Sequence, residues 1–325
     1  MSDLSAGCFG KLPIYPDFIR HNATNTEVSQ LDQWFQEGIQ FSKLRLGQEW
    51  PETFSRAESW NFLFYPDHAR HFLLGVYGPS RDQGGRLYPF FIFLRIEYAP
   101  SQLPLYFAPS YFSSFLNKAR GILQNGWKDM DLKTFISGIG AIELNMDENI
   151  AETRERYLHY LRENTSREFW TGLFGDFSHA GKYLVIRNLA DILGALRQNP
   201  ENKFGLGLKF PLMPQPDGET FDIPFWFDMI LRSLRHDRLS PVFFWNRNPT
   251  LGKPCMLTFL SQPSPKGFLF LMNPDMDSDY WYDLAPENMK EIDRVLNIIE
   301  KDQKELLDNE TLLLTSFLEA IETFG

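Results

Sequence analysis

The first hundred residues show two patterns of apolar residues, one with helical spacing and one with short continuous runs. From Thr26 they recur with a period near 3.6, which predicts an amphipathic helix that ends near Gly47. Apolar runs of strand type surround this helix, and the turn-rich segment GPSRDQGGR separates the last two of them. The predicted strands are a short one at residues 9–12 and longer ones at residues 60–65, 72–77 and 87–98.

The same two patterns of apolar residues predict the helices and strands of the remaining chain. Helical spacing indicates helices at residues 110–123, 147–164 and 222–236, and acidic helices from Pro286 onward. Continuous apolar runs indicate strands at residues 204–212, 241–246, 255–260 and 267–273. Residues 181–199 are interpreted as a strand that leads into a short helix, followed by a loop at residues 199–200.

The two halves of the chain repeat one order of elements. Each has a strand with glycine and lysine that ends in proline (residues 11–13 and 209–211), then a helix with a Trp-Phe pair, then a Trp-containing strand. We predict an α+β fold with mixed or antiparallel sheets flanked by helices, built from two related units. The first unit is residues 1–165, with a helical connector, and the second is residues 166–325, ending in acidic helices. One continuous mixed sheet is the alternative.

Composition and charge narrow the class of protein. Of the 325 residues 43% are hydrophobic and 15% aromatic, which is typical of a globular chain, and the net charge of −10 argues against nucleic acid or anionic membranes as partners. The chain opens with no secretory signal and holds no apolar run long enough to span a membrane. The two cysteines, Cys8 and Cys255, predict no disulfide framework, so we expect a cytoplasmic protein.

The candidate motifs for catalysis and cofactor binding are incomplete. The opening segment GCFGKLP resembles a phosphate-binding loop only superficially, because its glycine spacing is wrong and Leu12 and Pro13 follow the lysine. His68 and His71 form no complete ligand set for a metal, and alternating aspartates at 275–279 lack the glycine and glutamate of a calcium loop. No nucleophile motif surrounds either cysteine. The sequence therefore predicts no catalytic residues, no metal and no cofactor.

Polar residues gather where strands end, and we call this set the polar rim. It consists of Lys11, Asp17, Ser80, Arg81, Asp82 and Arg86. An arginine beside a buried strand needs a partner, so one interpretation is that Arg86 pairs with Asp17 and holds the loop together. The other is that the polar rim contacts a partner, with phosphate capture by Lys11, Arg81 and Arg86 as a weaker version.

Tryptophans provide a second set of candidates. Trp60, Trp170, Trp226 and Trp245 lie in apolar segments and are predicted to be in the core. Tyr280 and Trp281 lie with Tyr282 in a polar loop, where exposed aromatic residues are typical of a contact surface. We therefore expect either the polar rim or this loop to be the partner-binding surface.

The order of these motifs resembles a known family. The segments GCFGKLPIYPDFIR, LDQWFQEGI, SWNFLF and GVYGPSRDQGGRLYPF are similar to the N-terminal region of the TagF (ImpM) family, accessory proteins of bacterial type VI secretion systems. The matching positions are Gly7, Gly10, Lys11, Leu12, Pro13, Asp17, Phe18, Trp34, Trp60, Phe62, Pro79, Ser80, Asp82, Gly85, Arg86, Tyr88 and Pro89. Pro16 departs from the pattern, because the family has glycine there.

The resemblance implies a regulatory role. The resemblance implies a post-translational repressor of the secretion apparatus. It also implies action through protein–protein interaction with a forkhead-associated scaffold protein. The metal motifs of the phosphatase to which some relatives are fused are not found here. The expected function is thus a non-enzymatic regulator. The alternatives are a structural or assembly subunit of the apparatus, or a hydrolase that uses the polar rim near Lys11, Asp17 and Arg86.

Overall fold

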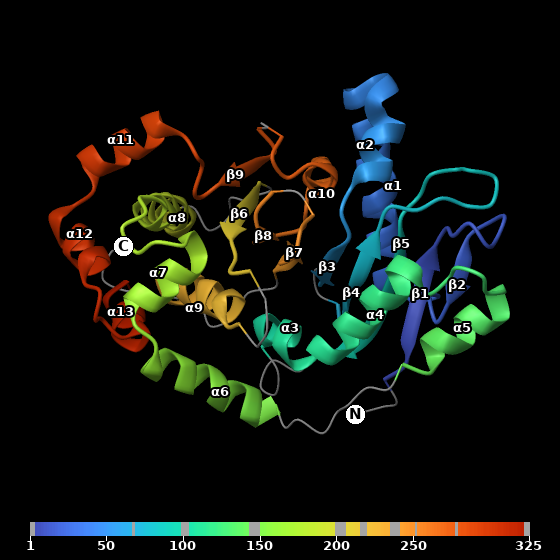
Figure 1. Cartoon of the computed structure of the whole chain (residues 1–325), viewed down its shortest axis with the longest axis horizontal. Coiled ribbons are helices and arrows are strands. Elements are labelled where there is room, and N and C mark those ends of the chain that lie inside the picture. Colours follow the sequence, from blue (N-terminus) through green and yellow to red (C-terminus); the bar gives the residue numbers. More distant parts are fainter. Residues whose placement is uncertain are drawn as a thin grey trace.

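In the computed structural model of the chain, the residues that the structure describes contribute nine strands to one mixed sheet (Figure 1). The structure describes residues 4–66, 69–98, 104–142, 150–198, 206–214, 220–234, 241–250, 252–276 and 279–321. Within these residues the strand order is β2-β1-β5-β4-β3-β7-β8-β6-β9. Neighbouring strands are antiparallel except for β6 and β9, which are parallel. The strands are β1 (Ala6–Gly10), β2 (Ile19–His21), β3 (Trp60–Phe64), β4 (His71–Gly78), β5 (Phe90–Glu97), β6 (Gly207–Pro211), β7 (Val242–Asn246), β8 (Cys255–Phe259) and β9 (Trp281–Asp283).

Strands β3 and β7 join the two halves of the chain. Phe62 pairs with Phe244 across this junction, and the indole of Trp60 donates a hydrogen bond of 3.0 Å to the carbonyl of Leu271. The α+β class is confirmed, and the described strands form one continuous mixed sheet, the arrangement that the sequence left as the alternative to two related units. The division of the chain at residue 165 into two domains stays a prediction.

Helices cover both faces of the sheet and separate the core into two layers. One layer lies beneath α1, α2 and α10, and the other beneath the helices from α4 to α9 and α13. Successive side chains of a strand point to opposite faces of the sheet, so β5 contributes to both layers. Phe91 and Phe93 face the first layer, while Ile92 and Leu94 face the second. The helices are α1 (Thr26–Leu46), α2 (Trp50–Arg56), α3 (Ala108–Tyr111), α4 (Ser113–Asn125), α5 (Leu132–Gly140), α6 (Ile150–Glu163), α7 (Ser166–Phe174), α8 (Gly181–Gln198), α9 (Asp222–Leu234), α10 (Phe268–Met272), α11 (Met289–Ile298), α12 (Lys301–Asp308) and α13 (Leu314–Ile321). Figure 1 shows α11, α12 and α13 along the outer edge of the second half.

Local signals explain the bounds of α1. The side chain of Asn25 accepts a hydrogen bond of 3.0 Å from the amide of Val28, which caps the first turn. Gly47 follows the last residue with φ of 55°, a conformation that favours glycine. The predicted helix is confirmed, and its apolar stripe packs on the sheet.

Gly10 has a steric reason to be glycine. Its φ is 129°, and a Cβ at this position would lie 2.1 Å from the carbonyl oxygen of Pro89. The close approach brings β1 against the start of β5. This glycine of the opening motif therefore serves strand packing and not the cradling of a phosphate.

Two predicted elements are wrong, for related reasons. Residues 181–198 form one continuous helix, α8, rather than a strand and a short helix. Residues 181–186 are all buried, and the apolar run at residues 183–186 therefore has the pattern of a buried strand. Residues 268–272 form the short helix α10 rather than a strand, again with all five residues buried. The preceding Ser264-Pro265 pair caps a turn of 3-10 helix that leads into α10, and this is a helix-start signal.

The other predictions for the core are confirmed. Trp60, Trp170, Trp226 and Trp245 are at most 2% exposed. The predicted loop at residues 199–200 lies outside the described residues. None of the described helices has both the length and the apolar character required to span a membrane.

Candidate functional site

Asp82 is the centre of the polar rim. It lies in the turn between β4 and β5, and its side chain is fully buried. Lys11 Nζ lies 3.0 Å and Arg86 Nε 2.6 Å from Asp82 Oδ2, while the backbone amide of Arg86 donates to Oδ1 over 2.9 Å. One carboxylate thus joins the end of β1 to the turn before β5.

The predicted pairing of Arg86 with Asp17 is wrong. Arg86 pairs with Asp82 four residues earlier, and its Nη2 donates to the carbonyl of Pro16 over 2.6 Å. The Asp17 carboxylate accepts from the amide of Phe18 instead and is exposed. The tight turn around Gly85, with φ of 82°, brings Arg86 back onto Asp82, and sequence distance alone does not reveal this.

The donors around Asp82 determine its titration. Burial alone would raise the pKa of the Asp82 carboxyl, but the Arg86 amide and the Lys11 and Arg86 side chains donate to the carboxylate and lower the pKa to about 2. Asp82 is therefore ionised at neutral pH. Its carboxylate already accepts hydrogen bonds from Lys11 and Arg86 and has a low pKa, so Asp82 is a poor candidate for a general base.

The depressed pKa of Asp82 predicts a pH dependence of stability. The stabilisation from ionised Asp82 is fully present above its unfolded-state pKa of about 3.9 and is lost as the pH falls through about 2. We expect Asp82→Asn to lower the free energy of unfolding at pH 6. This deficit relative to the wild type should shrink as the pH falls from about 4 towards 2. Urea unfolding of both proteins over this range is the measurement, and a deficit independent of pH would contradict the role of the charge.

The polar rim also presents cations to solvent. Arg81 is exposed, Ser80 is half-buried beside it, and the Arg86 side chain is 63% exposed although it pairs with Asp82. Lys11, by contrast, is only 6% exposed, so it pairs with Asp82 in the interior and is not accessible to a partner. Phosphate capture by all three cations together therefore does not fit the geometry.

Sequence reasoning missed Phe18 and Arg20 as parts of this surface. The guanidinium of Arg20 lies 5.3 Å from the ring centroid of Phe9 and 6.0 Å from that of Phe18, and Lys11 Nζ lies 4.9 Å from the Phe18 ring. The short strand β2 places Arg20 opposite Phe9, and this pairing was the missing information. Arg20 extends the exposed cationic surface beyond Arg81 and Arg86.

The second predicted surface is only partly exposed. Trp281 is 7% exposed and packs edge-on against Phe270 at 5.3 Å between ring centroids, so its placement as an exposed contact residue is wrong. Tyr280 is half-buried, with its ring against Phe41 at 5.2 Å, whereas Tyr282 is 39% exposed. Trp281 lies on β9, where side chains alternate between the two faces, and the surrounding polar residues concealed this strand.

A lysine occupies the centre of the acidic segment near residue 275. Lys209 Nζ lies 3.1 Å from the carbonyl of Pro274, 3.1 Å from Asp283 and 3.4 Å from Asp275. Burial would lower the pKa of Lys209, but Asp283 and Asp275 outweigh it and raise the pKa above its ordinary value. The ammonium group of Lys209 thus lies among the oxygen atoms that a bound calcium ion would need as ligands. Asp277 and His68 lie outside the described residues.

The described part of the chain offers little for catalysis. It contains no group of three or more His, Cys, Asp or Glu residues placed to hold a metal ion. Cys8 and Cys255 are buried and unpaired, and burial raises the pKa of each thiol to about 12. Both therefore remain thiols at neutral pH, a form in which cysteine is a poor nucleophile.

Comparison with known proteins identifies a domain in the first half of the chain. Residues 7–139 match the family model of the TagF N-terminal domain, which is described as Type VI secretion system-associated. The chain thus contains a TagF N-terminal domain. The TagF domain contains the whole polar rim, whereas Tyr280 and Trp281 lie beyond it.

A solved structure extends the likeness to both halves of the chain. The protein in the crystal structure of PA0076 from Pseudomonas aeruginosa PAO1 is 14% identical in sequence to this chain, and the two structures superpose with a TM-score of 0.52. The match covers 86% of this chain and 98% of that one. At this identity the likeness concerns the fold alone. No curated protein matches the sequence significantly.

Proposed function

We propose that this chain is a non-enzymatic regulator that represses a bacterial type VI secretion system by binding another protein. The observation that carries the proposal is the match of residues 7–139 to a secretion-associated domain that contains the whole polar rim. Two further features support it. The Asp82 carboxylate is committed to its ion pairs, and both cysteines are held as thiols.

The polar rim is the surface we assign to the partner. Arg86 pairs with Asp82, while Arg81 and Arg20 carry exposed positive charge on a protein whose net charge is −10. A local positive surface on an acidic protein favours an acidic surface on the partner and disfavours most other contacts. We propose that this partner is the forkhead-associated scaffold that the resemblance to TagF proteins implies, and that the contact forms in the cytoplasm.

Affinity purification with quantitative mass spectrometry tests the proposal. The tagged chain is purified from cells that express the secretion system, and the recovered proteins are quantified relative to it. A regulator is expected to recover the forkhead-associated scaffold in excess over sheath and tube components. Recovery of the assembled apparatus in fixed stoichiometry would instead indicate a structural subunit, and recovery without the scaffold would contradict the proposed partner.

The hydrolase alternative has its own test. A hydrolase would require an occupied site at the polar rim, so metal analysis of the purified protein and binding of phosphate-containing compounds are the measurements. We expect neither a stoichiometric metal nor saturable binding that depends on Arg86. Either finding would overturn the non-enzymatic assignment.

A further inference from the structure

The described sheet ends at the short strand β2, which follows directly after Asp17 of the polar rim (Figure 1). Within the described residues β2 pairs with β1 alone, so its other side has no strand beside it. Main-chain N–H and C=O groups on such an edge can pair with a strand from another protein. We call this side of β2 the β2 edge.

The main chain of Arg20 points to the β2 edge. In an antiparallel strand the hydrogen bonds of successive residues alternate between its two neighbours. The amide of Lys11, just after β1, donates to the carbonyl of Pro89 over 3.4 Å on the β5 side, so Phe9, two residues earlier, bonds to β5 as well. Arg20 lies opposite Phe9 in the register, and this pair is therefore not hydrogen-bonded. The N–H and C=O of Arg20 consequently point away from β1.

The side chain of Arg20 is exposed and lies over two aromatic rings. Its guanidinium is 5.3 Å from the ring centroid of Phe9 and 6.0 Å from that of Phe18. Phe18 in turn packs edge-on against Tyr88, with 4.9 Å between ring centroids. Among the described residues no carboxylate forms an ion pair with Arg20. One residue of the β2 edge thus offers a main-chain donor, a main-chain acceptor and a positive charge.

Charge selects the occupant of the β2 edge. Arg81 and Arg86 are exposed in the neighbouring turn, and Arg86 donates to the carbonyl of Pro16 in the loop before β2. This local positive surface lies on a protein whose net charge is −10, and it favours an acidic occupant. A second copy of the chain is disfavoured, because pairing two β2 edges about a two-fold axis would place Arg20 opposite its own copy.

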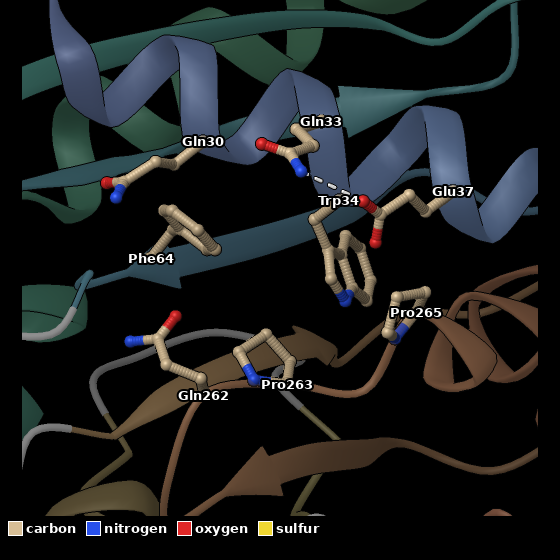
Figure 2. Close-up of a pocket in the computed structure, with 8 residues that line it drawn as sticks. All are labelled: Gln30, Gln33, Trp34, Glu37, Phe64, Gln262, Pro263 and Pro265. Carbon is tan, nitrogen blue, oxygen red and sulfur yellow. Dashed lines mark hydrogen bonds between the residues drawn. The ribbon is translucent and has the colours of Figure 1, made fainter.

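A surface hollow elsewhere on the chain offers an acidic segment no such charge. It measures about 190 Å³ and lies between α1 and residues 262–265 (Figure 2). Its exposed lining residues are three glutamines and Glu37, none of its lining residues is a cation, and Trp34 at its base is buried. A carboxylate-bearing segment is therefore attracted to the β2 edge and not to this hollow.

We propose that the β2 edge binds an extended acidic segment of the partner protein as an added antiparallel strand. This binding mode rests on the proposed function, because the partner is the same protein. The partner residue opposite Arg20 exchanges two main-chain hydrogen bonds with it, and its side chain lies on the same face as the guanidinium. Asp or Glu at that position forms the ion pair, and the following residues run back towards the loop at residues 13–18. Arginine on an edge strand also discourages indiscriminate strand pairing, so the carboxylate makes the contact selective.

The test follows the main-chain amide of Arg20 in a ¹H–¹⁵N correlation spectrum of the full chain labelled with ¹⁵N-arginine. The Arg20→Lys variant assigns the signal. The probe is the acetylated, amidated peptide Thr-Val-Thr-Glu-Thr-Val-Thr, and the same peptide with glutamine or lysine at its centre is the control. Because β2 has only three residues, we expect the glutamate peptide to shift the signal saturably with a Kd of about 5 mM or tighter. The glutamine peptide should bind about threefold more weakly, and the lysine peptide more weakly still.

Matched variants connect the selectivity to the Arg20 guanidinium. The amide of residue 20 is labelled selectively in each protein, and thermal unfolding controls for folding. Arg20→Gln should bind the glutamate and glutamine peptides equally, whereas Arg20→Lys should keep the preference for glutamate. Arg56→Gln is the control variant and should leave both affinities unchanged, since Arg56 pairs with Glu52 on α2.

Three outcomes would overturn the proposal. No shift up to about 10 mM glutamate peptide would mean that Arg20 only protects the edge. Equal affinity for the three peptides would mean unselective strand pairing. A shift with protein concentration in the absence of peptide would identify a second copy as the occupant. Each of these leaves the proposed function intact if the tagged chain still recovers the scaffold, while peptide binding without scaffold recovery would overturn the proposed function alone.

Discussion

Replacing Arg247 by methionine is expected to lower the free energy of unfolding by about 3–5 kcal/mol, the largest single-residue effect that we predict. Arg247 and Asp222 form a buried two-contact ion pair, with distances of 2.5 and 2.8 Å, and Asp222 is 0% exposed. The amides of Met213 and Ile223 also donate to Asp222. Without the guanidinium, a buried carboxylate would keep only these neutral donors, and that is the physical reason for the loss.

Chemical denaturation of the wild type and three variants measures this effect. The double variant Asp222→Asn/Arg247→Met should recover much of the loss, because it leaves no buried charge unpaired. Arg56→Met is the matched control, since Arg56 pairs with Glu52 on the surface of α2 and should change stability by less than about 1 kcal/mol. An effect of Arg247→Met as small as that of Arg56→Met would contradict the assignment of a structural ion pair.

Arg81→Glu is expected to weaken binding of the proposed partner, the forkhead-associated scaffold, by at least tenfold, about 1.4 kcal/mol. Arg81 is exposed on the polar rim and does not pair with Asp82, so reversing its charge removes attraction for an acidic partner without opening the buried cluster. Arg86→Glu would not separate loss of attraction for the partner from disruption of the buried cluster, because Arg86 pairs with Asp82.

A binding titration at two salt concentrations checks this second prediction. Arg56→Glu is the control, because it makes the same charge change on α2. The wild type should lose affinity as salt is added, and Arg81→Glu should lose less. Equal weakening by Arg81→Glu and Arg56→Glu would mean that net charge matters and the polar rim does not.

Sequence reasoning succeeded where local signals and periodicity agree. The helix from Thr26 to Leu46 has its Asn25 cap, its 3.6 spacing and Gly47 at its end, so each signal predicts the same bounds. The errors at α8 and α10 arise where residues are buried on all sides, because an unbroken apolar run is compatible with either a strand or a helix. Pairing of β3 with β7 depends on tertiary contacts, and no local pattern encodes it.

The sequence indicates which residues form the polar rim but not how they pair with one another. Lys11, Asp82 and Arg86 were grouped correctly as polar residues at strand ends, and the structure brings them together. The identity of the shared carboxylate depends on the turn at Gly85, and the contribution of Arg20 depends on its pairing with Phe9. Trp281 was placed at the surface because its neighbours in sequence are polar, although β9 buries it.

The central claim is repression through protein contact, and secretion in a deletion strain tests it most directly. Effector proteins in the culture supernatant are quantified in the wild type, in the deletion strain, and in the deletion strain that expresses either the wild-type chain or Arg81→Glu at equal levels. Secretion is predicted to rise on deletion and to fall again with the wild-type chain but not with Arg81→Glu. Unchanged or lower secretion in the deletion strain would contradict repression.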